Sequence, residues 1–177
     1  GVDWISEIPV SWGIHPIKRT CLIFTGGTPR SGEANFWDGD VPWVTPADLG
    51  KSTTPYIMKG TKSITLEGYS ACGTSLVPKD ALILSSRAPI GTIGIASGSL
   101  CTNQGCKSLV VSSDFYSKYI YYVLLISTVQ LKSLGRGTTF LELSTDELGC
   151  YKFASPAINE QQKIANFLDH ETAKIDR

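Results

Sequence analysis

Three short runs rich in Ile, Leu and Val, all between positions 81 and 111, place the strongest constraint on how this chain can fold. They cover Ala81 to Leu84, Thr92 to Ala96 and Lys107 to Val111, and residues such as Gly, Pro, Ser and Asn separate them. Apolar runs of this length between turn residues are typical of consecutive buried strands. We therefore expect these three strands to form the centre of a sheet.

The loops between these predicted strands are polar. One carries Ser85, Ser86 and Arg87, and the other carries Asn103 and Gln104. A guanidinium group and side-chain amides can form paired hydrogen bonds with base edges or phosphates. A rigid sheet that presents such loops favours a recognition surface over a catalytic centre.

The charge distribution supports the same interpretation. The chain of 177 residues has a net charge of zero, yet Lys51 to Leu141 contains nine basic and three acidic residues, a net charge of +6 that leaves −6 for the remainder. A basic middle region can bind phosphate while acidic ends keep the protein soluble. From charge alone, an ordinary solvated surface explains these lysines equally well.

Cysteine usage and hydropathy bear on the compartment. The five cysteines are odd in number and scattered, which argues against a disulfide framework and favours the reducing cytoplasm. Cys101 and Cys106 lack a second Cys or His pair at zinc-ligand spacing, so we expect free buried thiols. No apolar run approaches the length of a membrane span, and no signal peptide is expected. Because the chain starts without Met and ends inside a predicted helix, we expect a piece of a longer protein or a half-subunit.

The first half of the chain is expected to be mostly short elements. Ser31 to Gly39 reads as a surface loop, and Val41 to Val44 as a strand that leaves through a tight non-helical turn at Thr45 to Leu49. Thr65 is expected to cap a short helix that ends before Gly73. The Trp-rich opening segment is expected to pack against the edge of the domain.

The second half is expected to contain one long buried helix. Apolar residues cover nearly every face of Phe115 to Leu134, and Asp114 precedes it as a candidate cap, although its aromatic and β-branched content leaves a strand as the alternative. Phe140 to Leu148 and Tyr151 to Phe153 are predicted as short closing strands. The fold class is therefore α+β, with a mixed or antiparallel sheet, a few short helices and one buried helix.

The last segment, residues 156–177, differs in character from residues 1–155. Asn159 with the glutamines that follow predicts a capped start of an amphipathic helix. An apolar stripe on that helix requires a cover, which either its own domain or a partner helix in a coiled coil can supply. The stripe residues chosen as the partner or dimer surface are Ile164, Phe167, Leu168 and Ile175.

No catalytic constellation is apparent. Gly50, Lys51 and Ser52 resemble the end of a phosphate loop, but Thr45 stands where that motif requires Gly. Neither a nucleophile elbow nor a carboxylate pair placed for nuclease chemistry occurs. A nucleophilic Cys106 with a distant His is the weaker alternative, so the chain is predicted to be non-catalytic.

Eight short motifs, in order along essentially the whole chain, resemble a target recognition domain of the specificity subunit of type I restriction-modification systems. They are Ile8-Pro-x-x-Trp12, Gly27-Thr-Pro29, Trp37-x-Gly39 with Val41-Pro-Trp43, Ile64-Thr-x-x-Gly68, Arg87-Ala-Pro-Ile-Gly91, Thr102-Asn-Gln-Gly105-Cys106, Gly135-x-Gly137-Thr138 and Pro156-x-x-x-Glu160-Gln-x-Lys-Ile-Ala165. Each motif is weak alone, and their shared order carries the resemblance.

The resemblance implies a non-catalytic protein of the bacterial or archaeal cytoplasm. It would read one half of a bipartite double-stranded DNA target, and its C-terminal helix would begin a coiled-coil spacer. The implied partners are a methyltransferase subunit that uses S-adenosylmethionine, a restriction and translocase subunit that uses ATP and Mg²⁺, and a second copy or second recognition domain. No cofactor is expected on this chain itself.

Candidate DNA contacts come from the basic middle region. Arginines and amides would read bases, and lysines would hold phosphates. The predicted set is Lys51, Thr53, Lys62, Arg87, Asn103, Gln104, Lys107, Arg136 and Thr138. Residues within the shared motifs, such as Arg87 and Asn103, could instead be scaffold, with the base readers in the unmarked loop from Lys51 to Lys62. The alternative function is a protein-interaction scaffold whose basic face has no DNA sequence specificity.

Overall fold

The computed structural model describes residue 5, residues 7–137 and residues 141–175. Its strands are β1 (Gly13–Pro16), β2 (Cys21–Thr25), β3 (Trp37–Val44), β4 (Tyr56–Ile57), β5 (Lys62–Ile64), β6 (Leu82–Ser85), β7 (Ile93–Ala96), β8 (Cys101–Thr102), β9 (Cys106–Val111) and β10 (Lys152–Ser155). Its helices are α1 (Pro46–Lys51), α2 (Leu66–Ser70), α3 (Ser117–Ile126), α4 (Thr128–Ser133), α5 (Thr145–Cys150) and α6 (Ile158–Ile175), with 3-10 turns at Ile17–Arg19 and Ala34–Phe36.

The three apolar runs form the middle of a five-stranded sheet, ordered β2-β9-β6-β7-β4. The first four strands pair antiparallel and β4 joins β7 in parallel, so the sheet is mixed. A smaller sheet, β5-β3-β8, lies beside it, and β1 pairs with β10 as a separate ribbon. The predicted α+β class with a mixed sheet is confirmed, and the predicted central strands are correct to within one residue at either end.

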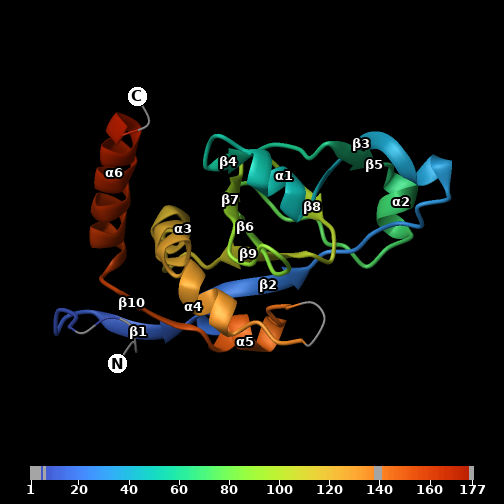
Figure 1. Cartoon of the computed structure of the whole chain (residues 1–177). Coiled ribbons are helices and arrows are strands. Elements are labelled where there is room, and N and C mark those ends of the chain that lie inside the picture. The colour runs from blue at the N-terminus through green and yellow to red at the C-terminus, as the bar shows by residue number, and fades with distance from the viewer. Residues whose placement is uncertain (1–4, 6, 138–140, 176–177) are drawn as a thin grey trace.

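Strand β6 shows why these runs have apolar residues at consecutive positions. Leu82 and Leu84 belong to a cluster that α3 and α4 cover, whereas Ile83 belongs to a second cluster with Leu49 of α1. Successive side chains in a strand point to opposite faces, so a sheet covered on both faces requires apolar residues at every position. Figure 1 shows α3 and α6 on one side of the central sheet and the smaller sheet with α2 on the other.

Two predictions for the first half are wrong. The turn after β3 is a helix, α1, because Pro46 occupies its first position, where a missing N–H costs nothing, and Asp48 accepts a hydrogen bond from the Thr45 backbone N–H. The expected surface loop ends early, because β3 already begins at Trp37. Thr65 does cap α2, since its hydroxyl accepts the Gly68 N–H at 3.0 Å.

The predicted long helix is two helices. Ser127 interrupts it between α3 and α4, and the N-cap is Tyr116 rather than Asp114. The helices are also less buried than expected, because Ile126 and Val129 are exposed at 63% and 74%. The stretch predicted as a closing strand contains α5 instead, whose cap Ser144 accepts the Glu147 N–H at 3.1 Å.

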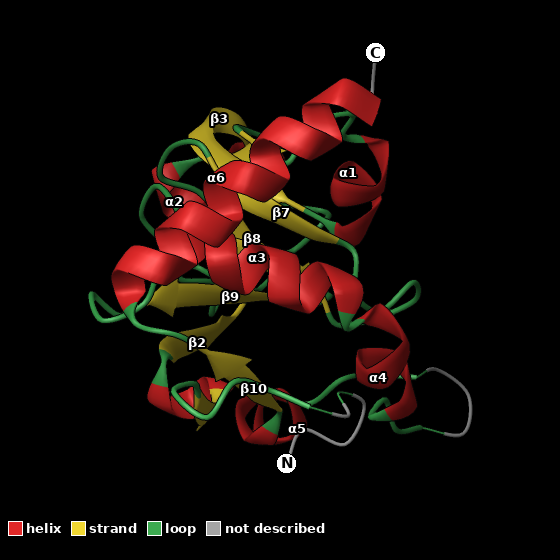
Figure 2. Ribbon diagram, turned by 90° about the vertical axis from the view of Figure 1, so that its left-hand side faces the viewer, coloured by secondary structure: helices red, strands yellow, loops and turns green. Residues whose placement is uncertain are grey.

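Helix α6 packs on α3 of its own domain, as Figure 2 shows. Asp169 of α6 pairs with Lys118 and accepts a hydrogen bond from the Tyr122 hydroxyl at 2.8 Å. The helix begins at Ile158, so Asn159 lies inside its first turn and is not its cap.

The predicted partner stripe of α6 divides into two pairs. Ile164 and Leu168 pack against the core, whereas Phe167 and Ile175 are exposed at 63% and 82%. The division into a recognition domain and a spacer helix stays a prediction. Within the described residues, no helix is both long and apolar enough to cross a membrane.

Candidate nucleic-acid interface

A hollow of about 450 Å³ opens between α1, β3 and the segment that leads into β5. We call it the lysine-rim hollow. Its principal lining residues are Thr28, Trp37, Trp43, Asp48, Lys51 and Lys62. Two of the predicted DNA contacts, Lys51 and Lys62, therefore come together here although they lie on different elements.

Asp48 holds the two sides of this hollow together. Its carboxylate accepts hydrogen bonds from the backbone N–H and the hydroxyl of Thr45, at 2.9 and 2.6 Å, and from the same groups of Thr61, at 2.8 and 2.6 Å. Burial alone would raise the pKa of Asp48, but these four hydrogen bonds outweigh it and lower the pKa below its ordinary value. The carboxylate thus fixes α1 relative to the segment that carries Lys62.

The approach of that segment requires glycine at position 60. A Cβ added there would lie 2.3 Å from the Trp43 carbonyl oxygen and 2.7 Å from a carboxylate oxygen of Asp48. Neither atom can move away without breaking the hydrogen bonds around the hollow.

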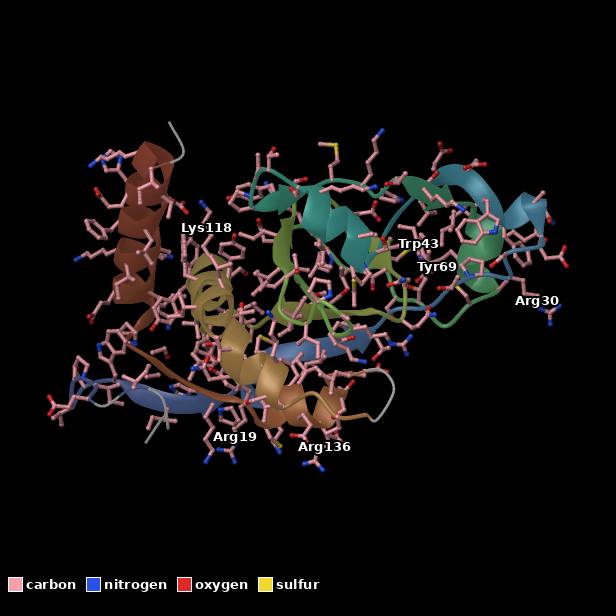
Figure 3. All side chains as sticks on the ribbon, in the orientation of Figure 1. Arg19, Arg30, Trp43, Tyr69, Lys118 and Arg136 are labelled. Atoms are coloured by element: carbon pink, nitrogen blue, oxygen red, sulfur yellow. The ribbon has the colours of Figure 1, made fainter. Side chains whose placement is uncertain are left out.

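Two tryptophans form the wall of the hollow. The rings of Trp37 and Trp43 meet edge to face, with centroids 5.3 Å apart. The Trp43 indole N–H donates to the Gly27 carbonyl at 2.9 Å, and the Lys62 ammonium lies 5.2 Å from the Trp37 centroid. Figure 3 labels Trp43 on this side of the molecule, with Arg30 extending beyond it. The packed rings of Trp37 and Trp43 thus form an apolar wall beneath the ammonium group of Lys62.

The cations on this rim face solvent. Lys51, Lys59 and Lys62 are exposed, and so is Thr53 in the loop after α1. Over the described part of the chain, none of these three lysines forms an ion pair with a carboxylate. Their charge is therefore available to an anionic ligand.

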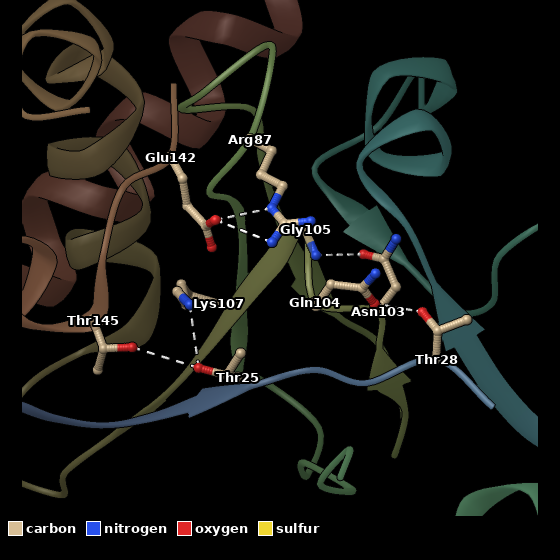
Figure 4. Close-up of polar contacts among 9 residues, drawn as sticks. All are labelled: Thr25, Thr28, Arg87, Asn103, Gln104, Gly105, Lys107, Glu142 and Thr145. Atoms are coloured by element: carbon tan, nitrogen blue, oxygen red, sulfur yellow. Dashed lines mark hydrogen bonds and ion pairs between the residues drawn. The ribbon is translucent and has the colours of Figure 1, made fainter. Parts of the chain in front are cut away.

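A second group of predicted contacts lies at the ends of β2, β6 and β9 and is shown in Figure 4. We call Thr25, Arg87, Lys107, Glu142 and Thr145 the Arg87 cluster. Arg87 donates from Nε to one carboxylate oxygen of Glu142 at 3.1 Å, and its Nη2 forms an ion pair with the same oxygen at 3.0 Å. Lys107 donates to the Thr25 hydroxyl at 3.2 Å, and Thr25 also contacts the Thr145 hydroxyl at 3.4 Å. Here the cations already have protein partners.

Lys107 is unusual among the predicted contacts because it is only 4% exposed. Burial lowers its pKa, the Glu142 carboxylate opposes that shift, and the Arg87 guanidinium reinforces it. A buried ammonium with one hydrogen bond from its three donors is incompletely satisfied. Lys107 therefore cannot reach a phosphate as a simple surface lysine would.

Thr28 and Gln104 connect the hollow with the loop before β9, and the Gly105 carbonyl of that loop accepts the N–H of Ser86, the residue before Arg87, at 2.8 Å. The Thr28 hydroxyl lines the hollow and donates to the Gln104 side-chain oxygen, and Gln104 is exposed. Asn103 is half-buried, and its side-chain oxygen accepts the Gly105 N–H at 3.0 Å, so it stabilises the loop that presents Gln104.

The remaining predicted contacts lie elsewhere. Arg136 forms an ion pair of 2.7 Å with Glu147 of α5 and points away from the sheet in Figure 3. Ser85 and Ser86 are fully buried, so neither can read a ligand. Thr138 lies outside the described residues.

The structure adds two carboxylates that the sequence analysis overlooked. Asp48 could have been found, because Thr45-Pro-x-Asp48 is a helix-start signal. Glu142 could not, because nothing in its neighbourhood indicates an ion pair with a residue 55 positions earlier.

Catalytic alternatives gain no support from the geometry. Cys106 is fully buried, and burial raises the pKa of its thiol to about 12, so it carries almost no nucleophilic thiolate at neutral pH. The described residues contain no group of three or more His, Cys, Asp or Glu side chains that could hold a metal ion.

Fold and surface together define a class: an α+β domain whose sheet ends and adjoining loops gather basic and amide side chains on one connected surface. The chain belongs to the family of the type I restriction modification DNA specificity domain, whose model matches residues 9–176. The family resemblance inferred from the motifs is confirmed.

Individual relatives agree with this assignment. The chain is 36% identical over 168 residues to the type I restriction enzyme MjaIX specificity subunit of Methanocaldococcus jannaschii, covering 94% of this chain and 39% of that protein. The HsdS subunit of Thermoanaerobacter tengcongensis has a similar fold, with a TM-score of 0.73, 20% identity and coverage of 96% of this chain and 39% of that one.

A chain from a structure concerned with complex assembly and conformational transition of the type I R-M system matches with a TM-score of 0.76 and 21% identity, over 96% of this chain and 40% of that one. The chain therefore spans about two fifths of the length of the relatives that it matches.

Proposed function

We propose that this chain recognises a short sequence in double-stranded DNA, as one half-site reader of a type I specificity subunit. One observation carries the proposal. In a chain of this family, the exposed lysines of the lysine-rim hollow continue through Thr28 and Gln104 to the Arg87 cluster, which forms one connected surface of cations and amides. Such a surface suits phosphates and base edges together.

Different residues of this surface would contact phosphates and bases. Lys51 and Lys62, with Thr53 beside them, would contact phosphates and set the register of the duplex. Gln104, held by Thr28 and by the loop that Asn103 stabilises, is the best candidate to read a base edge. Arg87, Lys107 and Arg136 would contribute less directly, because protein groups already engage them.

The chain itself would be non-catalytic and cytoplasmic. Methylation of adenine with S-adenosylmethionine, and translocation and cleavage with ATP and Mg²⁺, would belong to the methyltransferase and restriction subunits. Residues 1–155 would form the recognition domain, and residues 156–177 would start a helix that joins a second copy or a second recognition domain. Phe167 and Ile175 are available to such a partner.

The test is selection of bound duplexes from a randomised pool, with and without the methyltransferase subunit, at two salt concentrations and with single-stranded DNA and RNA controls. One short motif enriched at both salt concentrations is the expected result. Binding that is uniform across sequences and fades steeply with salt would favour the alternative, a protein-interaction module with a basic face.

A further inference from the structure

The Arg87 cluster contains its own anion. One oxygen of Glu142 accepts the hydrogen bond of Arg87 Nε and forms the ion pair with Nη2, and the same carboxylate favours the charged form of buried Lys107. Figure 4 shows Arg87 in contact with this carboxylate, whereas the Lys107 ammonium, on β9, donates to Thr25. A guanidinium that contacts one oxyanion through two of its nitrogens can bind a phosphate in the same way.

The backbone, rather than the ion pair, positions Glu142. Its N–H donates to the Arg136 carbonyl at 2.9 Å, its carbonyl accepts the Arg136 N–H at 3.0 Å, and the next residue, Leu143, donates to the Ser86 carbonyl at 2.8 Å. Loss of the Glu142 charge would therefore leave the chain path in place. The carboxylate can be exchanged without dismantling the cluster.

The cluster also has more donors than acceptors among the described residues. Of the five N–H groups of Arg87, those on Nε and Nη2 face Glu142, and Lys107 uses one of its three donors on Thr25. The side chains of Arg87 and Glu142 are 45% and 38% exposed, so an incoming phosphate can reach the guanidinium.

We propose that Glu142 occupies the place of a phosphate on the Arg87 guanidinium, and that this internal counter-ion restrains non-specific binding to DNA. The inference rests on the proposed DNA-binding function and adds a regulatory residue to it. A duplex that fits the rest of the surface would displace the carboxylate, because its base contacts offset the free energy lost with the Arg87–Glu142 ion pair. A random duplex lacks those base contacts and would bind more weakly.

The decisive variant is Glu142→Gln, which keeps the shape and an oxygen acceptor for Arg87 but removes the charge. On a random-sequence duplex we expect affinity to rise about fivefold, and the slope of log affinity against log salt to steepen by about one phosphate contact. Fluorescence anisotropy over a salt series measures both quantities. The discrimination between selected and random duplexes should fall by the same factor.

Two controls separate this effect from a change in net charge. Glu171→Gln removes one carboxylate from an ion pair on α6, at 2.7 Å from Lys174, and should leave affinity unchanged. Adding Arg87→Ala to Glu142→Gln should abolish the gain. An equal gain in Glu171→Gln, or no gain in Glu142→Gln while the wild-type chain binds DNA, would overturn the inference.

A second measurement needs no DNA. Inorganic phosphate at constant ionic strength should raise the thermal midpoint of Glu142→Gln and leave that of the wild type unchanged, because only the variant has an open site. Phosphate stabilisation without any binding to duplexes would retain the anion site but contradict the proposed function. Equal midpoint shifts in both proteins would refute the role of Glu142.

Discussion

The lysine-rim hollow and the Arg87 cluster contain the same kinds of side chain in opposite states. In the hollow the lysines are exposed and form no ion pair within the described residues. The buried carboxylate there, Asp48, accepts its hydrogen bonds from two threonines. In the Arg87 cluster the Glu142 carboxylate contacts Arg87, and Lys107 is buried. A count of basic residues treats the two regions as equivalent.

The difference shows that available charge, not the number of charges, defines a binding surface. The Asp48 carboxylate forms hydrogen bonds with threonines and no ion pair with a described lysine, whereas the Glu142 carboxylate lies 3.0 Å from Arg87 and offsets its charge. We therefore expect the lysines of the hollow to contribute most of the affinity for duplex DNA and the Arg87 cluster to change that affinity by a smaller amount. Four variants test this comparison.

Asp48→Asn should have the largest effect. The amide has one oxygen where the carboxylate accepts four hydrogen bonds, so the free energy of unfolding should fall by about 3 kcal/mol. Urea denaturation near neutral pH measures this fall. The pKa of Asp48 is lowered from 3.8 in the folded state, so its contribution is complete above about pH 4 and disappears as the pH falls through the folded value. The difference in free energy of unfolding between the wild type and Asp48→Asn should therefore become smaller as the pH falls below about 4.

The matched control for Asp48 is Asp40→Asn on β3, because Asp40 is exposed and does not line the hollow. It should change the free energy of unfolding by less than about 0.5 kcal/mol. Equal losses in both variants would show that the Asp48 carboxylate is not the element that holds the hollow together.

Lys51→Ala combined with Lys62→Ala should weaken duplex binding about tenfold at near-physiological salt. Loss of two phosphate contacts should also make the slope of log affinity against log salt shallower by about two. Anisotropy titrations at several salt concentrations give both values. Lys163→Ala with Lys174→Ala removes equal charge from α6, so a comparable loss there would place the contact surface elsewhere.

Lys107→Met should stabilise the protein in the absence of DNA, by about 1 kcal/mol at neutral pH, because it replaces an incompletely satisfied buried charge with an apolar chain of similar volume. Burial lowers the pKa of Lys107 from 10.5, so charging it costs stability below its folded pKa. That cost vanishes as the pH rises through the folded value, and the advantage of Met should shrink with it. Chemical denaturation across alkaline pH measures the trend, and a destabilised variant would mean that Glu142 already compensates the charge.

Arg136→Ala should have the smallest effect. Its side chain is 83% exposed in the pair with Glu147, and exposed ion pairs contribute only about 0.5 kcal/mol. Urea denaturation and duplex binding should both remain close to wild type. A loss of binding comparable to that of the lysine pair would extend the contact surface from the hollow to α5.

Much of the fold follows from local sequence. The central strands were predicted because a sheet covered on both faces requires continuous apolar runs, as β6 shows. The errors occurred at helix starts: Pro46 begins α1 where a non-helical turn is predicted, and Ser144 with Glu147 begins α5 where a strand is predicted. The break at Ser127 interrupts an apolar stretch and leaves no trace in its periodicity.

For the site, the sequence by itself determined which side chains are present and that the basic ones lie in the middle of the chain. The tertiary structure decided which of them meet, because ion pairs and burial depend on distances in space. Lys51 and Lys62 share one hollow through the Asp48 hydrogen bonds, whereas Arg87 meets Glu142 across 55 positions and Lys107 lies buried beside them. A cation attracts an external phosphate only where no internal carboxylate lies closer, and only the folded chain determines that.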